Sequence, residues 1–390
     1  MKNIKTGQRD RAGLLTGGGG VIVSVMGKTT PLADIHRAHG AEFVEQDGWI
    51  LPARFGAPIK EYEAVRSAVG LLDLCDYAAV ELTGPDCVFY LQGMITNDVK
   101  SLCPGAGMYA AVVDVNGKIL ADLRVLCVEN STFVLLMREP LKDKVITQLN
   151  KYLVADDVEI VDHAGRYGLI SLQGPHALLL LTAVAPHQDP PVHMVHHRLL
   201  RVGDRPLRAI RSTHTGEEGF DLLIQSGDLR FVASELERAG TALAFRWTGL
   251  EALEILRVEA GLPRYGVDMD EDNLLLETGL DSAVSFNKGC YVGQEVIERV
   301  RSRGHVNRKL AGIALKGESP AQRGDKIHAD GKEIGRITSA VFSPRLNHAI
   351  ALGYIHRGYL QTGTSVSIDR DGAEVGGTVT TLPFVFSTSP

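Results

Sequence analysis

The sequence is poor in cysteine: it has five cysteines in 390 residues, and no two of them are spaced as C-x-x-C. Zinc knuckles and thioredoxin-type redox sites need such close pairs, so the cysteine pattern argues against both. The number of cysteines is odd and their spacings are wide, which also argues against a disulfide scaffold. We therefore expect a reducing, cytoplasmic environment.

Long apolar runs are also missing. No stretch approaches the roughly 20 apolar residues that span a bilayer, and the segment 14–26 is interrupted by four glycines at 17–20. We interpret residues 1–29 as a flexible leader, or as the product of an upstream start codon with translation beginning at Met26. The formal net charge is −6, so no basic excess favours nucleic acid or an anionic membrane surface as a partner.

Several nucleotide-binding and catalytic motifs are absent. The sequence has no G-x-G-x-x-G after a strand pattern, no G-x-x-x-x-G-K-[ST] loop and no G-x-S-x-G elbow. It therefore predicts no dinucleotide, nucleotide or serine-hydrolase site. His193, His196 and His197 have a metal-like spacing, but no cysteine lies nearby to complete a ligand set. We interpret them as solvated histidines of a surface strand and predict no metal site.

One pattern occurs twice along the chain. Residues 80–91 read V-E-L-T-G-P-D-C-V-F-Y-L, and residues 170–181 read I-S-L-Q-G-P-H-A-L-L-L-L. Each copy predicts a strand, a Gly-Pro pair and an apolar helix with proline at its first position. A separation of 90 residues is too long for a solenoid repeat. The chain is too long for one compact core. The repeated pattern therefore favours two related α+β domains, which we place at 30–162 and 163–304.

The C-terminal part of the sequence has a different residue pattern. From Arg308 onward, short β-type segments alternate with glycine turns. Strands at this spacing favour a small all-β barrel or sandwich, which we place at 305–390. The predicted fold class is therefore α+β, with two α+β domains followed by a β domain.

Segments spread over residues 30–385 resemble the T-protein of the glycine cleavage system, an aminomethyltransferase. They include 30–36, 80–86, T-N-D-V at 96–99, T-G-E-E-G-F at 215–220, R-V-E-A-G-L-P at 257–263 and L-P-F at 382–384. The resemblance implies a three-lobed ring of two ferredoxin-like α+β domains and a C-terminal β-barrel. It also implies that tetrahydrofolate binds in the central channel.

One segment departs from the T-protein pattern. Residues 288–295 read K-G-C-Y-V-G-Q-E and match the hallmark K-G-C-Y-x-G-Q-E of the YgfZ-like branch of the same superfamily. The resemblance implies a tetrahydrofolate-binding protein that supports maturation or repair of iron–sulfur enzymes, with iron–sulfur client or assembly proteins as partners. The specified residues of the motif are Lys288, Gly289, Cys290, Tyr291, Gly293, Gln294 and Glu295.

Two acidic residues are candidates for the folate site. A carboxylate accepts charge-assisted hydrogen bonds from the donor-rich edge of a pterin, and it can deprotonate an amine during one-carbon transfer. Asp98, in T-N-D-V, matches the T-protein position implied to be catalytic; its alternative is an ordinary turn residue after a helix. Glu217, in T-G-E-E-G-F, is implied to contact the pterin; its alternative is a solvated hairpin tip.

Two further residues are candidate folate contacts. Arg257, in R-V-E-A-G-L-P, is implied to contact folate; its alternative is an i,i+3 ion pair with Glu254 on a helix surface, contributing a few tenths of a kcal/mol. Tyr109 is predicted either to stack on or hydrogen-bond the cofactor, or to be a core tyrosine. His214 stands where T-proteins usually have tyrosine, so the wall of the pterin pocket is expected to differ.

Cys290 is the candidate for a second catalytic group. Its neighbouring glycines allow close approach of the backbone, and Lys288 or the start of a helix predicted at 294–301 would stabilise a thiolate. We therefore predict a partly exposed, activated thiol. Three functions remain open: a folate-binding maturation factor, an aminomethyltransferase that moves a one-carbon unit to tetrahydrofolate and releases ammonia, and a non-catalytic scaffold.

Overall fold

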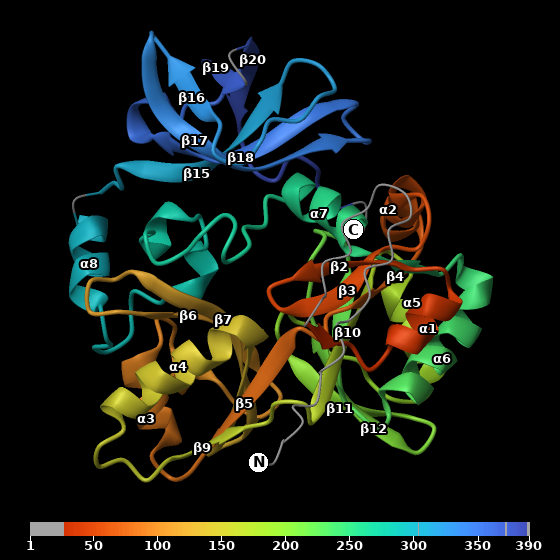
Figure 1. Cartoon of the computed structure of the whole chain (residues 1–390). Helices are drawn as coiled ribbons and strands as arrows, with labels where there is room; N and C mark the ends of the chain where they lie inside the picture. The colour runs from red at the N-terminus through yellow and green to blue at the C-terminus, as the bar shows by residue number, and fades with distance from the viewer. Residues whose placement is uncertain (1–26, 303, 371–372, 388–390) are drawn as a thin grey trace, which may run out of the picture.

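The computed structural model describes residues 27–302, 304–370 and 373–387. Figure 1 shows three lobes: two α+β lobes lie side by side, and a β-barrel lies across one end of both. The expected α+β class with a C-terminal barrel is thus confirmed. Within the described residues, every helix is too short or too polar to cross a bilayer.

The first lobe is built on a five-stranded antiparallel sheet with the order β6-β7-β8-β5-β9. Helix α4 lies on it because Leu141, Val145 and Leu149 recur every fourth residue and form one buried face. The elements are β5 (Tyr77–Thr83), α3 (Cys87–Met94), η1 (Val99–Ser101), β6 (Gly107–Val113), β7 (Ile119–Glu129), β8 (Thr132–Arg138), α4 (Glu139–Tyr152) and β9 (Glu159–Asp162).

The second lobe is built on a six-stranded sheet with the order β11-β12-β13-β10-β4-β14. Helices α5 and α6 enclose its main core with Phe220 and Leu222 of the sheet. The elements are β4 (Gly70–Asp73), β10 (Tyr167–Gln173), α5 (Ala177–Val184), β11 (His197–Val202), β12 (Arg205–Arg211), β13 (Gly219–Gln225), α6 (Leu229–Gly240), η2 (Thr241–Leu243) and β14 (Arg246–Thr248).

The lobes do not follow the division expected at residue 162. Strand β4 comes before the first lobe in sequence, yet it pairs with β10 and β14 in the second. All four of its residues are buried, and such a short apolar strand is stable only inside a sheet. The preceding residues form a three-stranded sheet, β1 (Lys28–Thr29), β2 (Glu42–Gln46) and β3 (Trp49–Arg54), with helices α1 (Ala33–Ala38) and α2 (Pro58–Ser67).

The expected leader overlaps the first described strand. Lys28 and Thr29 pair with Trp49 and Ile50, so these two residues belong to the three-stranded sheet. The leader's remaining residues up to 26 lie outside the described residues.

The repeated Gly-Pro pattern forms the same structure in both lobes. Gly84 and Gly174 have positive φ angles of 135° and 125°, and a Cβ atom at either position would lie within 2.6 Å of a backbone oxygen. The helices begin two residues later than expected, because Pro85 and Pro175 occupy a turn before the helix. Proline fixes φ near −65°, which suits the second position of such a turn.

The third lobe is a closed six-stranded barrel with the order β15-β18-β17-β16-β19-β20. Its interior is filled by isoleucine, valine and alanine side chains, including Ile313, Ile327 and Ile368. The elements are β15 (Arg308–Leu315), β16 (Lys326–Ala329), β17 (Lys332–Ser343), β18 (His348–His356), η5 (Arg357–Tyr359), β19 (Ser365–Arg370) and β20 (Ala373–Thr380).

The connection from the second lobe to the barrel contacts all three lobes. Helix α7 (Leu250–Glu259) contacts α2, β3 and the barrel strands β17 and β18. The chain then passes η3 (Leu275–Glu277), η4 (Asp281–Ala283) and α8 (Gln294–Ser302). This segment shares a core with β6 and β7 through Tyr291 and Ile297. It was expected in the second domain, but it packs on the first lobe.

Candidate functional site

A cavity of about 590 Å³ lies where the two α+β lobes meet α7. This volume is in the range of small-molecule and cofactor sites, about 300–1,000 Å³. Apolar side chains such as Leu74, Leu136 and Leu253 form much of its wall. The polar and aromatic lining residues include Asp76, Tyr77, Tyr109, Asp122, Arg124, Arg138, His214, Arg257, Arg264 and Tyr265.

Strand β7 directs two charged residues into the cavity. Asp122 and Arg124 are two residues apart, so they lie on the same face of the strand. On the neighbouring strand β6, Tyr109 donates its hydroxyl hydrogen bond to the Asp122 carboxylate. Burial raises the pKa of Asp122, and the hydrogen bond from Tyr109 opposes this rise without cancelling it. The carboxyl group thus keeps a proton at higher pH than an ordinary aspartic acid.

A second carboxylate, Asp221 of β13, lies behind the cavity wall. It is fully buried and pairs with Arg124 at 2.6 Å and with His214 at 3.0 Å. Burial by itself would raise the pKa of Asp221, but the charges of His214 and Arg124 outweigh it and lower the pKa. Asp221 therefore stays ionised and holds both cavity-lining side chains in place.

The two carboxylates differ in a way that suits acid–base chemistry. Asp122 touches the cavity and has a raised pKa, whereas Asp221 is paired and has a lowered pKa. Pairs of titratable groups whose environments push their pKa values apart are typical of enzymes that use one group as an acid and the other as a fixed charge.

Among the residues expected to contact folate, Tyr109 and Arg257 line the cavity. The Arg257 guanidinium pairs with Glu254 and, at 2.7 Å, with Asp268. It also donates to Ser339 of the barrel. The expected i,i+3 pair with Glu254 is present, but Arg257 is buried rather than on a helix surface.

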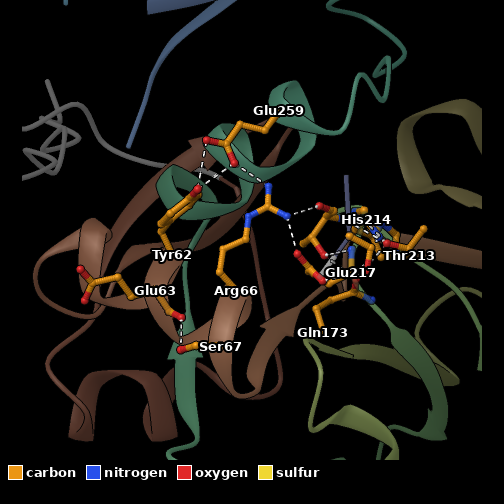
Figure 2. Close-up of polar contacts among 12 residues, drawn as sticks. Tyr62, Glu63, Arg66, Ser67, Gln173, Thr213, His214, Glu217 and Glu259 are labelled. Carbon is orange, nitrogen blue, oxygen red and sulfur yellow. Dashed lines mark hydrogen bonds and ion pairs between the residues drawn. The ribbon is translucent and has the colours of Figure 1, made fainter. Parts of the chain in front are cut away.

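Glu217 is absent from the cavity wall. It is 2% exposed, so it is not a solvated hairpin tip. Arg66 of α2 lies between Glu217, at 2.6 Å, and Glu259 of α7, at 2.5 Å (Figure 2). Tyr62 donates to Glu259 as well, at 2.9 Å. We call Tyr62, Arg66, Glu217 and Glu259 the Arg66 network; it joins α2, the β12–β13 connection and α7.

Asp98 also lies outside the cavity wall. It follows α3 directly before η1, and its carboxylate accepts a 2.8 Å hydrogen bond from Gln92. The neighbouring Asn97 donates from its side chain to the backbone oxygens of Tyr109 and Ser282. Asp98 thus lies in the turn between α3 and η1, and its catalytic role stays a prediction.

The Lys288–Glu295 segment is held against the Asp98 turn. Lys288 donates to the backbone oxygens of Ile95 at 2.6 Å and Asn97 at 2.8 Å, and burial lowers its pKa to about 8. Its ammonium group is therefore directed at this turn. Cys290 and Gly289 are exposed, which agrees with the exposed thiol expected at Cys290, and neither residue lines the cavity.

Other residues of this motif make packing contacts. Gly293 has φ +80°, and a Cβ atom there would lie 2.3 Å from the backbone oxygen of Asp114 in the β6–β7 hairpin. Tyr291 is buried in the core that this segment shares with the first lobe. Gln294 begins α8, and Glu295 pairs with Arg299 on the exposed side of that helix.

Sequence reasoning missed Asp122, Arg124, Asp221 and Arg264 as cavity or cavity-supporting residues. A signal was available in A-D-L-R at 121–124, where two charged residues share one face of an otherwise apolar strand pattern. No comparable signal marks Arg264, which becomes part of the site only through the path of the chain after α7.

The family models separate the barrel from the rest of the chain, as the fold does. The GCVT N-terminal domain matches residues 32–288, and the glycine cleavage T-protein C-terminal barrel domain matches residues 308–385. The chain belongs to the glycine cleavage T-protein family. Its relatives include proteins named aminomethyltransferase from Halothermothrix orenii, 30% identical over 92% of this chain and all of that protein, and from Bacillus subtilis, 30% identical over 92% and 99%.

A solved structure supports the T-protein fold. The glycine cleavage system aminomethyltransferase T from Bartonella henselae is 26% identical and superposes with a TM-score of 0.85, covering 92% of this chain and 98% of that one. The two-lobe and barrel arrangement of this chain is therefore the aminomethyltransferase fold.

Proposed function

We propose that this protein transfers a one-carbon unit from an amine to tetrahydrofolate, with Asp122 as the acid–base residue. The observation that carries the proposal is the Asp122 carboxyl in the cavity, with its raised pKa and its hydrogen bond from Tyr109. The relatives named aminomethyltransferase support the reaction class.

The cavity has the features that a reduced folate requires. Its volume and apolar wall suit a flat pterin and an aminobenzoyl ring. Asp122 offers an acceptor to the donor-rich pterin edge or to the reacting nitrogen. When bound, tetrahydrofolate supplies the nitrogen that accepts the one-carbon unit.

The side chains of the cavity then provide proton transfer and orientation. Loss of ammonia requires a proton on the departing nitrogen, and a carboxyl group with a raised pKa can hold that proton closer to neutral pH. Tyr109 fixes the orientation of the Asp122 carboxyl through its hydrogen bond. The ionised Asp221 keeps Arg124 and His214 in place at the other wall.

The test compares Asp122→Asn with Asp98→Asn in a transfer assay. The assay uses an aminomethylated lipoyl carrier protein with tetrahydrofolate and measures released ammonia. We expect Asp122→Asn to lower kcat at least about 100-fold, the usual contribution of a positioned acid or base, and Asp98→Asn to stay close to wild type. The reverse result would return the catalytic role to Asp98, as the T-N-D-V resemblance implied.

The exposed Cys290 segment favours a second candidate function. Because this thiol lies outside the cavity wall, it is available to a partner protein without disturbing folate binding. We propose as the second candidate the YgfZ-type role in maturation or repair of iron–sulfur enzymes. A strain lacking the protein would then lose [4Fe–4S] enzyme activity, and Cys290→Ala would fail to restore it. Normal activity in that strain would rule this candidate out.

A third outcome would exclude folate chemistry altogether. If the purified protein binds neither tetrahydrofolate nor tetrahydropteroate in a calorimetric titration, the cavity serves another ligand and the scaffold alternative stands.

A further inference from the structure

The four arginines that line the cavity are not equally compensated. Arg124, Arg138 and Arg257 each pair with a buried aspartate at 2.8 Å or closer. For the guanidinium of Arg264, the carboxylate contact is to Glu254 at 3.6 Å. The same Glu254 oxygen already accepts a 2.7 Å hydrogen bond from Arg257, so it is shared between two cations.

The uncompensated side of Arg264 is well defined. Its hydrogen bond to Gln46, at 3.3 Å, and its ion pair with Glu254 both involve Nη1. Its Nε atom is buried and has no hydrogen-bond partner among the described residues. A buried donor without a partner destabilises the folded protein, so a ligand that supplies an acceptor stabilises the position.

The electrostatic surroundings lead to the same conclusion. Burial lowers the pKa of Arg264, and the positive charges of Arg257 and Arg138 add to that effect against the opposing Glu254. For Arg124, Arg138 and Arg257, in contrast, neighbouring carboxylates outweigh burial and raise the pKa. Arg264 is thus the cavity arginine with positive charge left to neutralise.

We propose that Arg264 forms a carboxylate-binding subsite of the cavity. The Nε edge of a guanidinium presents two parallel N–H donors, and this fork matches the two oxygens of a carboxylate. This inference rests on the proposed function, in which two molecules can bring the carboxylate: the glutamate tail of the folate, or an amine donor that is an amino acid. A subsite for the second would select carboxylated donors over simple amines.

The first experiment tests the folate tail. Tetrahydrofolate and tetrahydropteroate, which lacks the glutamate, are titrated into wild type and Arg264→Gln by calorimetry. If the tail is the source, Arg264→Gln weakens tetrahydrofolate about 10- to 100-fold, as expected for a charge-assisted hydrogen bond, and leaves tetrahydropteroate unchanged. The control is Arg230→Gln, an exposed arginine that pairs with Asp34 outside the cavity wall; it should alter neither affinity.

The second experiment tests the amine donor. Glycine and methylamine differ by a carboxylate and serve as probes, with binding followed by ligand-observed NMR with and without tetrahydropteroate. If the donor is the source, Arg264→Gln weakens glycine binding and leaves methylamine unchanged. Arg264→Lys keeps the positive charge but lacks the two parallel N–H donors. Its affinity for the carboxylate-bearing probe of the responding pair should lie between those of wild type and Arg264→Gln. This variant also guards against a folding defect.

The outcomes separate the subsite from the proposed function. A change confined to one pair of probes supports the subsite and identifies the source of the carboxylate. The subsite is overturned if Arg264→Gln changes the affinity for both members of each pair equally, or changes the affinity for none of the four probes. If wild type binds neither folate probe but Arg264→Gln still weakens glycine, the proposed function fails and the subsite stands.

Discussion

The cavity and the Arg66 network contain the same residue types, arginine and carboxylate, but the two regions differ in how closely these groups are paired. In the Arg66 network, Arg66 lies between Glu217 and Glu259, and all three side chains are at most 6% exposed (Figure 2). In the cavity, Asp122 has a raised pKa and Arg264 has an unpartnered donor. Arg66 has a carboxylate at 2.6 Å and another at 2.5 Å, whereas the carboxylate contact of Arg264 is at 3.6 Å. Closely paired charges hold a structure together, whereas a charge in a cavity without a close partner is available to a ligand.

The position of Glu217 shows why residue type alone does not identify a ligand contact. It was expected at the pterin, yet it completes a buried ion pair that joins α2 to the β12–β13 connection. The same connection brings Thr213 and His214 to the cavity wall. The Arg66 network thus positions the cavity wall from behind.

The largest effect is expected when the Arg66 network is broken. Arg66→Met leaves Glu217 and Glu259 buried without their shared cation, and removal of one partner of a buried pair typically costs about 3–5 kcal/mol. Urea unfolding measures the loss. In the double variant Arg66→Met with Glu217→Gln, one stranded charge is gone, so part of the loss should be recovered. A loss below about 1 kcal/mol would contradict the contrast between the two regions.

The next largest effect concerns the backbone geometry of the Lys288–Glu295 segment rather than its charge. Gly293→Ala forces a side chain into a position with φ +80° and onto the Asp114 oxygen, so we expect destabilisation of about 1–3 kcal/mol. Gly289 of the same motif has open space around it, and Gly289→Ala is the matched control. Similar losses in both variants would show that close packing is not the role of Gly293.

At Asp122 in the cavity, we expect a substitution that preserves or raises stability at high pH, in contrast to the losses expected at Arg66 and Gly293. Because its pKa is raised in the folded protein, the folded state binds the proton more tightly, and stability falls as pH rises from about 4 through the raised pKa. Asp122→Asn cannot ionise, so above that range its unfolding free energy should equal or exceed that of wild type. Unfolding at pH 5 and pH 8 checks this; an equal loss at both pH values would contradict it.

The smallest effect is expected at the exposed end of the motif. Glu295 and Arg299 form an i,i+4 pair on α8 with both side chains more than half exposed. Such pairs contribute about 0.3–0.5 kcal/mol, so Arg299→Ala should change the unfolding free energy by no more than this. Thermal unfolding at low and high salt measures this change. A larger loss of stability that does not depend on salt would contradict the prediction, because a buried ion pair behaves in that way.

The sequence by itself determined the elements that depend on local pattern. The two strand–Gly-Pro–helix units, the β6–β7 hairpin at Asn116-Gly117 and the alternating strands of the barrel follow from turn chemistry and periodicity. The resemblance to T-proteins was likewise visible in scattered motifs, and it predicted the family and the barrel correctly.

Only the tertiary structure decided which residues meet. Asp122 and Asp221 lie on different sheets about a hundred residues apart in sequence, and Arg264 lies in an irregular segment after α7 with no periodic signal. Strand β4 crossed the expected boundary because its apolar residues needed a buried place inside a sheet. Local sequence fixes local conformation, but the pKa of a carboxyl and the partners of an arginine depend on groups that folding brings from distant parts of the chain.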